Sequence, residues 1–266
     1  MSNARASFYN PGTGTLVIDS EATNYGYIGQ PTLQTTGSIV TATGFAPYKY
    51  RIVMPDNVNP PIVVVKPVAN VATYVEQSYL ISGTTWEFTC YSVSTSSVTI
   101  PGYRNTTVVA PLLYVWGPMV SSGSGAVMRL WNSAGTLAFD SNNHPLWLKG
   151  TCSFSAHSGS ASTDAAFTGD SSAIPSGITT PGVIGPPYQP TGDHDAAANS
   201  FYNPTGDDAD YWIYGWSLSG SNLLRRRFWL GTDRATNPYD PPNTSDFSMS
   251  YSLTACTALL IDLDGY

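Results

Sequence analysis

The chain contains one short segment twice, at positions about 120 residues apart. The first copy spans residues 8–20 and the second spans residues 130–141, with one residue fewer in the second turn. Each copy has an aromatic strand end, an Asn/Gly turn and a return run that closes with Asp-Ser. Because glycine adopts positive φ at little steric cost, both copies predict β-hairpins. A duplicated hairpin is a scaffold element, and nothing in it matches a catalytic constellation.

The residues that define the hairpin motif occupy equivalent places in the two copies. The aspartates can accept backbone N–H groups or pair with the following serine at the end of the strand, so we expect them to be structural. The motif residues are Asn10, Gly14, Asp19 and Ser20 in the first copy and Asn132, Gly135, Asp140 and Ser141 in the second.

The rest of the chain also favours strands and turns over helices. Charged residues make up only 11% of the chain and aromatic residues 12%, and there are 24 glycines and 20 prolines. We therefore predict an all-β fold built from antiparallel β-sandwich modules, with a long Ser/Gly/Pro-rich loop or arm. The expected strands before the second hairpin are residues 38–43, 48–53, 62–65, 74–81, 85–93 and 112–116.

Composition divides the chain into three parts. Residues 1–152 are expected to form a β-sandwich-like domain that carries both hairpins. Residues 153–199 are rich in Ser, Gly, Ala, Thr and Pro and have few large aliphatic side chains, so alone they cannot bury much apolar area. This part is interpreted as an arm or linker that orders on a neighbour. Residues 200–266 form a C-terminal β segment, which packs on the first domain or on a neighbour.

Charge and cysteine content limit the partners and the compartment. The net charge of −7 argues against nucleic acid as a partner, because phosphate binding needs clustered positive potential. Cys90, Cys152 and Cys256 are far apart and form no C-x-x-C pair, which predicts neither a disulfide framework nor a zinc site but small buried side chains. The first residues lack the apolar stretch of a signal peptide and the sequence has no 18-residue apolar run, so we expect folding in a reducing cytoplasm without a membrane span.

One basic cluster stands out in this acidic chain. Arg225, Arg226 and Arg227 lie between apolar residues in a strand-like run. They are interpreted mainly as an interface or edge-strand cluster that pairs with aspartates or blocks unwanted strand pairing. The alternative is a contact with an anionic glycan or a phosphate.

Seven tryptophans could act as stacking platforms for sugars, although tryptophans on alternating strands more often belong to the core. Trp212 and Trp216 are the candidate glycan contacts, because both lie in one strand-like run.

Catalytic and metal-binding candidates are sparse. Residues 193–195 (Asp-His-Asp) form the one local cluster around a histidine, and Asp207, Asp208 and Asp210 resemble a crude calcium loop without the EF-hand spacing. Paired acids for glycoside hydrolysis are supported only by the presence of aspartates. We therefore expect no catalytic residues, no bound metal and no cofactor.

The duplicated motif resembles a pattern in tail proteins of bacteriophages, where an aromatic-led strand, an Asn/Gly turn and a closing apolar-Asp-Ser recur in β-rich virion proteins. The resemblance covers roughly the first 150 residues, and the rest of the chain departs from it. It is carried by Tyr9, Asn10, Gly14, Leu16, Ile18, Asp19 and Ser20, and again by Trp131, Asn132, Gly135, Leu137, Phe139, Asp140 and Ser141.

The resemblance implies a non-enzymatic structural component of the virion tail, at the tail tip, the baseplate or the fibre attachment. Its partners would be other tail proteins and further copies of itself. The alternative is a tail module that binds a host receptor or a glycan, and a polysaccharide-degrading enzyme is a third and weaker interpretation.

Overall fold

The computed structural model describes residues 7–9, 16–19, 24–40, 44–76, 78–94, 108–121, 128–161, 169–185, 199–202, 209–233 and 248–266. Every regular element in these ranges is a strand, which confirms the all-β fold class. They accordingly contain no helix with the length and hydrophobicity that a membrane crossing requires.

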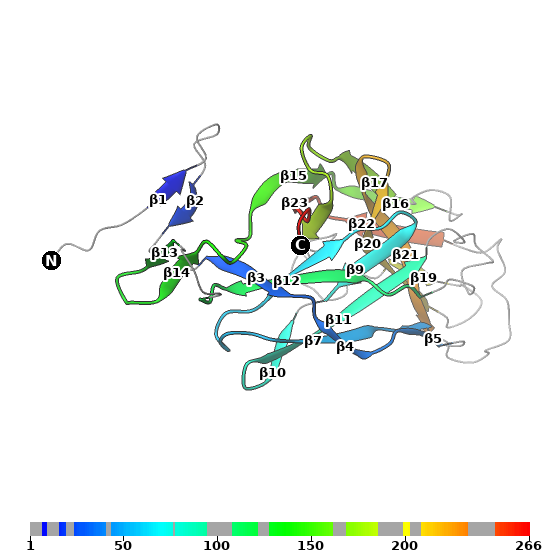
Figure 1. The fold of residues 1–266 in the computed structure, drawn as a ribbon. Helices are drawn as coiled ribbons and strands as arrows, with labels where there is room; N and C mark the ends of the chain where they lie inside the picture. The colour runs from blue at the N-terminus through cyan, green and yellow to red at the C-terminus, as the bar shows by residue number, and fades with distance from the viewer. Residues whose placement is uncertain are drawn as a thin grey trace.

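Two sheets form the body of the molecule (Figure 1). The smaller sheet has six strands. In spatial order they are β15 (Leu148–Phe154), β23 (Cys256–Asp262), β18 (Pro181–Ile184), β8 (Ile62–Lys66), β12 (Leu112–Pro118) and β3 (Tyr25–Gly29).

The larger sheet has eleven strands, and its pairs are antiparallel. Its main path is β16 (His157–Ala161), β22 (Ser248–Leu253), β19 (Asn199–Tyr202), β20 (Ala209–Ser219), β9 (Val71–Val75), β11 (Thr85–Ser94), β7 (Tyr48–Val53) and β4 (Thr32–Thr35). Beside this path, β10 (Tyr79–Ser82) pairs with β11, β21 (Asn222–Asp233) with β20, and β17 (Gly169–Ala173) with β21.

Three two-stranded hairpins complete the part of the chain that the structure describes. They are β1 (Ser7–Tyr9) with β2 (Leu16–Asp19), β13 (Arg129–Trp131) with β14 (Leu137–Asp140), and β5 (Ser38–Val40) with β6 (Gly44–Ala46). The first two are the duplicated segments, and in Figure 1 both lie at the end of the molecule away from β19.

The main hydrophobic core lies between the two large sheets. One cluster joins β7 and β11 to β8 and β12 and contains Tyr48, Tyr50, Met54, Val65, Trp86, Phe88, Cys90, Leu113 and Val115. A second joins β20 and β21 to the other half of the six-stranded sheet and contains Cys152, Phe154, Val183, Trp216, Leu223, Cys256, Ala258 and Leu260.

Strand β12 of the six-stranded sheet is buried on both faces. Leu113 and Val115 belong to the core between the sheets, whereas Tyr114 and Trp116 belong to a cluster on the opposite face. Successive side chains of a strand alternate between faces, so a sheet covered on both sides needs apolar residues at every position. The segment 263–266 helps to cover the second face, where Leu263 and Tyr266 join the cluster.

The strand pairing crosses the boundaries that composition suggests at 152 and 199. Three described strands lie wholly within the expected arm: β16 pairs with β22, β17 pairs with β21, and β18 lies between β23 and β8. Val183 of β18 is only 1% exposed, so a few apolar residues suffice when the partner strands supply the rest of the core. The expected strand 74–81 is also divided, between the end of β9 and β10.

The three cysteines are buried, as the sequence predicts. Burial raises the pKa of the Cys90 thiol well above its usual value. Burial likewise raises the pKa of the Cys152 and Cys256 thiols.

Alkaline pH should destabilise the fold through Tyr50. Burial in the core, reinforced by nearby Cys90 and Tyr48, raises the pKa of Tyr50 to about 12. The folded chain therefore holds this proton where an unfolded chain releases it, near pH 10. The stabilisation that the protonated Tyr50 contributes to the free energy of unfolding is fully present below about pH 10. It decreases by about 2–3 kcal/mol as the pH rises towards about 12.

Urea unfolding at a series of pH values measures this loss. Tyr50→Phe should keep about 2–3 kcal/mol more of its own neutral-pH stability than the wild type does over that range. Equal losses in the two proteins would contradict the assignment to Tyr50.

Candidate functional site

The two duplicated segments form hairpins with the same register. Phe8 pairs with Ile18 and Tyr9 with Leu16 in the first. In the second, the pairs are Leu130 with Phe139 and Trp131 with Leu137. Both registers shift at the equivalent place, between Phe8 and Tyr9 in the first hairpin and between Leu130 and Trp131 in the second. Asn10, Gly14 and Ser20 of the first copy lie outside the described residues, and Asp19 is the last residue of β2.

The turn of the second hairpin depends on Asn132 and Gly135. The Asn132 side-chain Oδ1 accepts the N–H groups of Ala134 at 3.0 Å and Thr136 at 2.8 Å. Gly135 has a φ of 79°, a conformation that residues with a Cβ adopt only at a cost in energy. Its N–H donates to the Asn132 carbonyl at 3.0 Å. The Asn-x-x-Gly spacing is therefore a requirement of the backbone.

Asp140 and Ser141 hold the base of the same hairpin. Asp140 is fully buried; its Oδ2 accepts from Arg129 Nε at 2.9 Å and its Oδ1 from the Asn142 N–H at 2.9 Å. Ser141 Oγ accepts the Met128 N–H at 3.0 Å. These contacts close the hairpin at the end where it meets the sandwich. We call this hairpin with its closing residues, 128–141, the tab.

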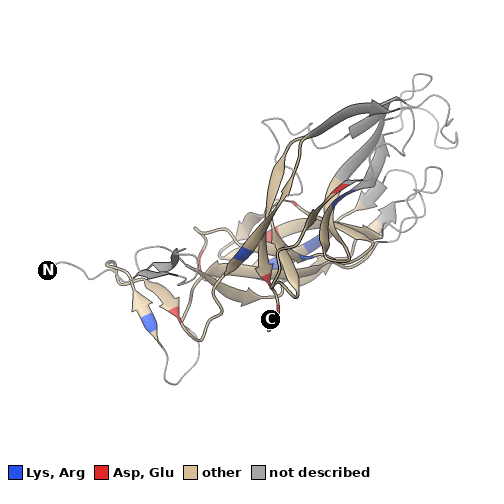
Figure 2. Cartoon of the chain, turned by 90° about the horizontal axis from the view of Figure 1, so that it is seen from above, with Lys and Arg blue, Asp and Glu red and all other residues tan. Residues whose placement is uncertain are grey.

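The tab is attached to the edge of the six-stranded sheet. Asn24 Nδ2 donates to the Ala138 carbonyl of the tab at 2.8 Å. Beyond the tab, residues 144–146 pair with β3, since the Tyr27 N–H donates to the His144 carbonyl at 2.8 Å and the Leu146 N–H to the Tyr25 carbonyl at 2.7 Å. Figures 1 and 2 both show the tab beyond the end of the two sheets.

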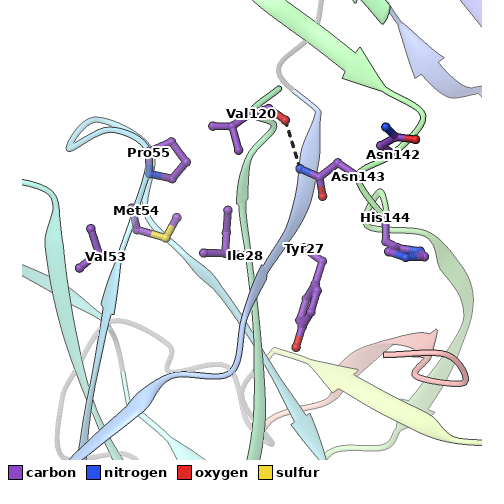
Figure 3. A pocket seen from close by; sticks show the side chains of 9 residues that line it. All are labelled: Tyr27, Ile28, Val53, Met54, Pro55, Val120, Asn142, Asn143 and His144. Atoms are coloured by element: carbon purple, nitrogen blue, oxygen red, sulfur yellow. Dashed lines mark hydrogen bonds between the residues drawn. The ribbon is translucent and has the colours of Figure 1, made fainter. Parts of the chain in front are cut away.

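A pocket of about 510 Å³ lies at the base of the tab (Figure 3). Its wall comes from four distant parts of the chain: β3, the end of β7 with the residues that follow it, the residue Val120 after β12, and the turn after β14. Most of its lining is apolar, and no Asp, Glu, Lys or Arg is among the described lining residues. They are Tyr27, Ile28, Val53, Met54, Pro55, Val120, Asn142, Asn143 and His144.

Asn143 is the buried polar residue of this pocket. It is only 7% exposed, its N–H donates to the Asp140 carbonyl at 3.0 Å, and its Nδ2 donates to the Val120 carbonyl at 3.4 Å. Its side chain packs directly on Gly26, where an added Cβ would lie 2.6 Å from Nδ2. Figure 3 shows the amide oxygen on the side facing away from Val120.

The sequence motif includes the base of the tab but not the pocket. Met54, Val120 and Asn143 meet only because β7, β12 and the tab converge at this end, and none of them lies in a recognisable motif. The Asn142-Asn143 pair directly follows Asp140-Ser141 and has the composition of an ordinary turn.

Arg225 is an internal ion-pair residue. It is 0% exposed, and its Nε and Nη2 bind the two carboxylate oxygens of Asp170 at 2.8 Å each. Its Nη1 donates to the Thr254 carbonyl at 2.8 Å and Nη2 to the Ser155 carbonyl at 2.7 Å. In this structure Arg225 is thus enclosed and has no access to a glycan or phosphate. Arg226 is half-buried, and the side chain of Arg227 lies outside the described residues.

The two candidate glycan tryptophans are both in β20. Trp216 is 1% exposed, packs on Phe154 with ring centroids 5.3 Å apart and donates from Nε1 to the Gly185 carbonyl at 2.8 Å. It is a core residue, which corrects its interpretation as a possible surface contact. The side chain of Trp212 lies outside the described residues. Instead, Trp131 at 55% and Trp147 at 45% are exposed.

The metal and catalytic candidates fall largely outside the described chain. Residues 193–195, Asp207 and Asp208 are not among the described residues, and only the backbone of Asp210 is. Within the described ranges, no group of three or more His, Cys, Asp or Glu side chains is arranged to hold a metal ion.

Removing the charge of Asp140 should weaken the tab. Asp140→Asn keeps the shape of the side chain but loses the ion pair with Arg129, so we expect a loss of about 1–3 kcal/mol in the free energy of unfolding. Urea denaturation measures it, with the exposed Asp264→Asn as the matched control. Equal stability of the two variants would contradict the role of the buried carboxylate.

Comparison of the chain with protein-family models, with curated proteins and with solved structures finds no match.

Proposed function

We propose that this protein is a structural component of a bacteriophage tail, at the tip, the baseplate or the fibre attachment, and that it acts by assembling with other tail proteins. The observation that carries the proposal is the pair of hairpins with the same register and the same bulge. Their motif resembles the one in phage tail proteins. Two hairpins of the same geometry also suit a subunit that makes equivalent contacts with neighbouring subunits.

Two further observations support an assembly role. The tab has a rigid, buried base at Asp140 but exposes Met128 and Trp131, so it presents apolar surface on a fixed support. The described charges are few and scattered over the strands (Figure 2), which suits a surface that packs against protein.

Immunogold labelling of intact particles of the phage that encodes the chain tests this function. The label should lie on the tail, and particles from which the gene is deleted should carry none and have incomplete tails. Intact tails in the deletion strain, or an unlabelled tail in the wild type, would contradict the proposal.

A second candidate, a glycan-binding tail module, is favoured by Trp147. Its ring is exposed, and Lys149 Nζ lies 4.6 Å from the ring centroid, which holds the indole as a flat platform. Glycan-array binding that is lost in Trp147→Ala and kept in Trp131→Ala would favour this candidate.

A further inference from the structure

Trp131 is an exposed anchor at the far end of the tab. It is the last residue of β13, next to the turn, and 55% of it is exposed. The other strand of the tab is buried from Ala138 to Asp140, and Asn24 donates to the Ala138 carbonyl at 2.8 Å. The indole is therefore exposed on a hairpin whose second strand is packed against the rest of the molecule.

The pocket at the base of the tab has the chemistry to receive an indole. Its exposed rim includes Val53 at 66% and Val120 at 40%, and its interior contains the buried Asn143. No described residue donates a hydrogen bond to Asn143 Oδ1. A tryptophan buries a large apolar ring and needs one acceptor for its N–H, and this pocket supplies both.

We propose that Trp131 of one copy inserts into this pocket of a second copy. The second copy inserts its own Trp131 into the pocket of the first, so that the two copies form a two-fold dimer. In the complex the indole N–H donates to Asn143 Oδ1, and the ring packs on Val53 and Met54. The proposal goes beyond the phage-tail function and does not depend on it, because self-association is a property of the isolated chain.

A second copy is the occupant that these features favour. An isologous interface needs an anchor and its receptor on the same surface region, and the tab and the pocket are neighbours at one end of the molecule. An inserted indole would meet no Asp, Glu, Lys or Arg among the described lining residues, and Arg129 of the tab is paired with its own Asp140 at 2.9 Å. A central aromatic anchor in a pocket is the usual source of binding energy in such contacts.

Sedimentation velocity of the full chain over a range of concentrations tests the dimer. The wild type should dimerise, and Trp131→Ala should raise the dissociation constant by about 30-fold or more. Trp147→Ala, which removes the other exposed tryptophan, should dimerise like the wild type. A wild type that stays monomeric at every concentration, or a Trp131→Ala variant that dimerises as tightly as the wild type, would overturn the proposal.

The pocket is tested with a second pair of variants. Val53→Glu places a charge at the rim and should prevent dimerisation. Val58→Glu, at a position that is 78% exposed and outside the lining, should not. Circular dichroism checks that each variant is folded.

Mixing the two variants distinguishes reciprocal insertion of Trp131 from other modes of association. Trp131→Ala retains an intact pocket and Val53→Glu retains an intact anchor, so the mixture can form one of the two contacts. The mixture should associate more tightly than either variant alone. If it does not, the reciprocal insertion of Trp131 is wrong, whether or not the protein proves to be a tail component.

Discussion

Replacing Arg225 with methionine should lower the free energy of unfolding by about 3–5 kcal/mol. The substitution leaves the Asp170 carboxylate, whose side chain is only 17% exposed, without its positive partner. It also removes the donors that the Thr254 and Ser155 carbonyls receive. Arg225 connects β21 to β17 and to the chain beyond β15 and β22, so its loss should loosen this side of the sandwich.

A double-mutant cycle with Asp170→Val distinguishes the ion pair from simple packing. Asp170→Val alone should cost a similar amount, because it leaves a fully buried guanidinium uncompensated. The double variant should cost clearly less than the sum of the two single variants. Urea unfolding measures all three. Arg226→Met is the matched control on the same strand, and a loss there as large as at Arg225 would contradict a specific buried pair.

The second large effect is expected at Gly215, where β20 lies directly against the backbone of β9. A Cβ at this position would lie 2.7 Å from the Thr73 backbone nitrogen and 2.9 Å from its carbonyl oxygen. Backbone cannot rotate away as a side chain can, so Gly215→Ala must separate the two strands. We expect a cost of about 3 kcal/mol or more, at the upper end for overpacked positions.

Thermal unfolding followed by circular dichroism measures the effect of Gly215→Ala. Ser219→Ala, at an exposed position of the same strand, is the control and should stay within about 0.5 kcal/mol of the wild type. A Gly215→Ala protein as stable as this control would show that β20 and β9 approach less closely than the structure has them.

These two positions show what sequence patterns leave open. The run around Arg225 reads as a strand with three basic residues, and nothing local distinguishes the arginine that is buried from its neighbours. Its partner, Asp170, lies 55 residues away in a Ser/Gly-rich stretch whose composition predicts an arm. Charge pairing over such a separation depends on which strands become neighbours, and that order is not written in local periodicity.

The sequence by itself determined the all-β class and the two hairpins, because turn chemistry and the alternation of faces act over a few residues. Asn132 and Gly135 specify their turn through backbone geometry alone. The tertiary structure alone decided that β18 enters the six-stranded sheet, that Trp216 is core, and that Met54, Val120 and Asn143 enclose a pocket. Those outcomes follow from long-range strand order, which is set by the burial of whole sheet faces and not by any single segment.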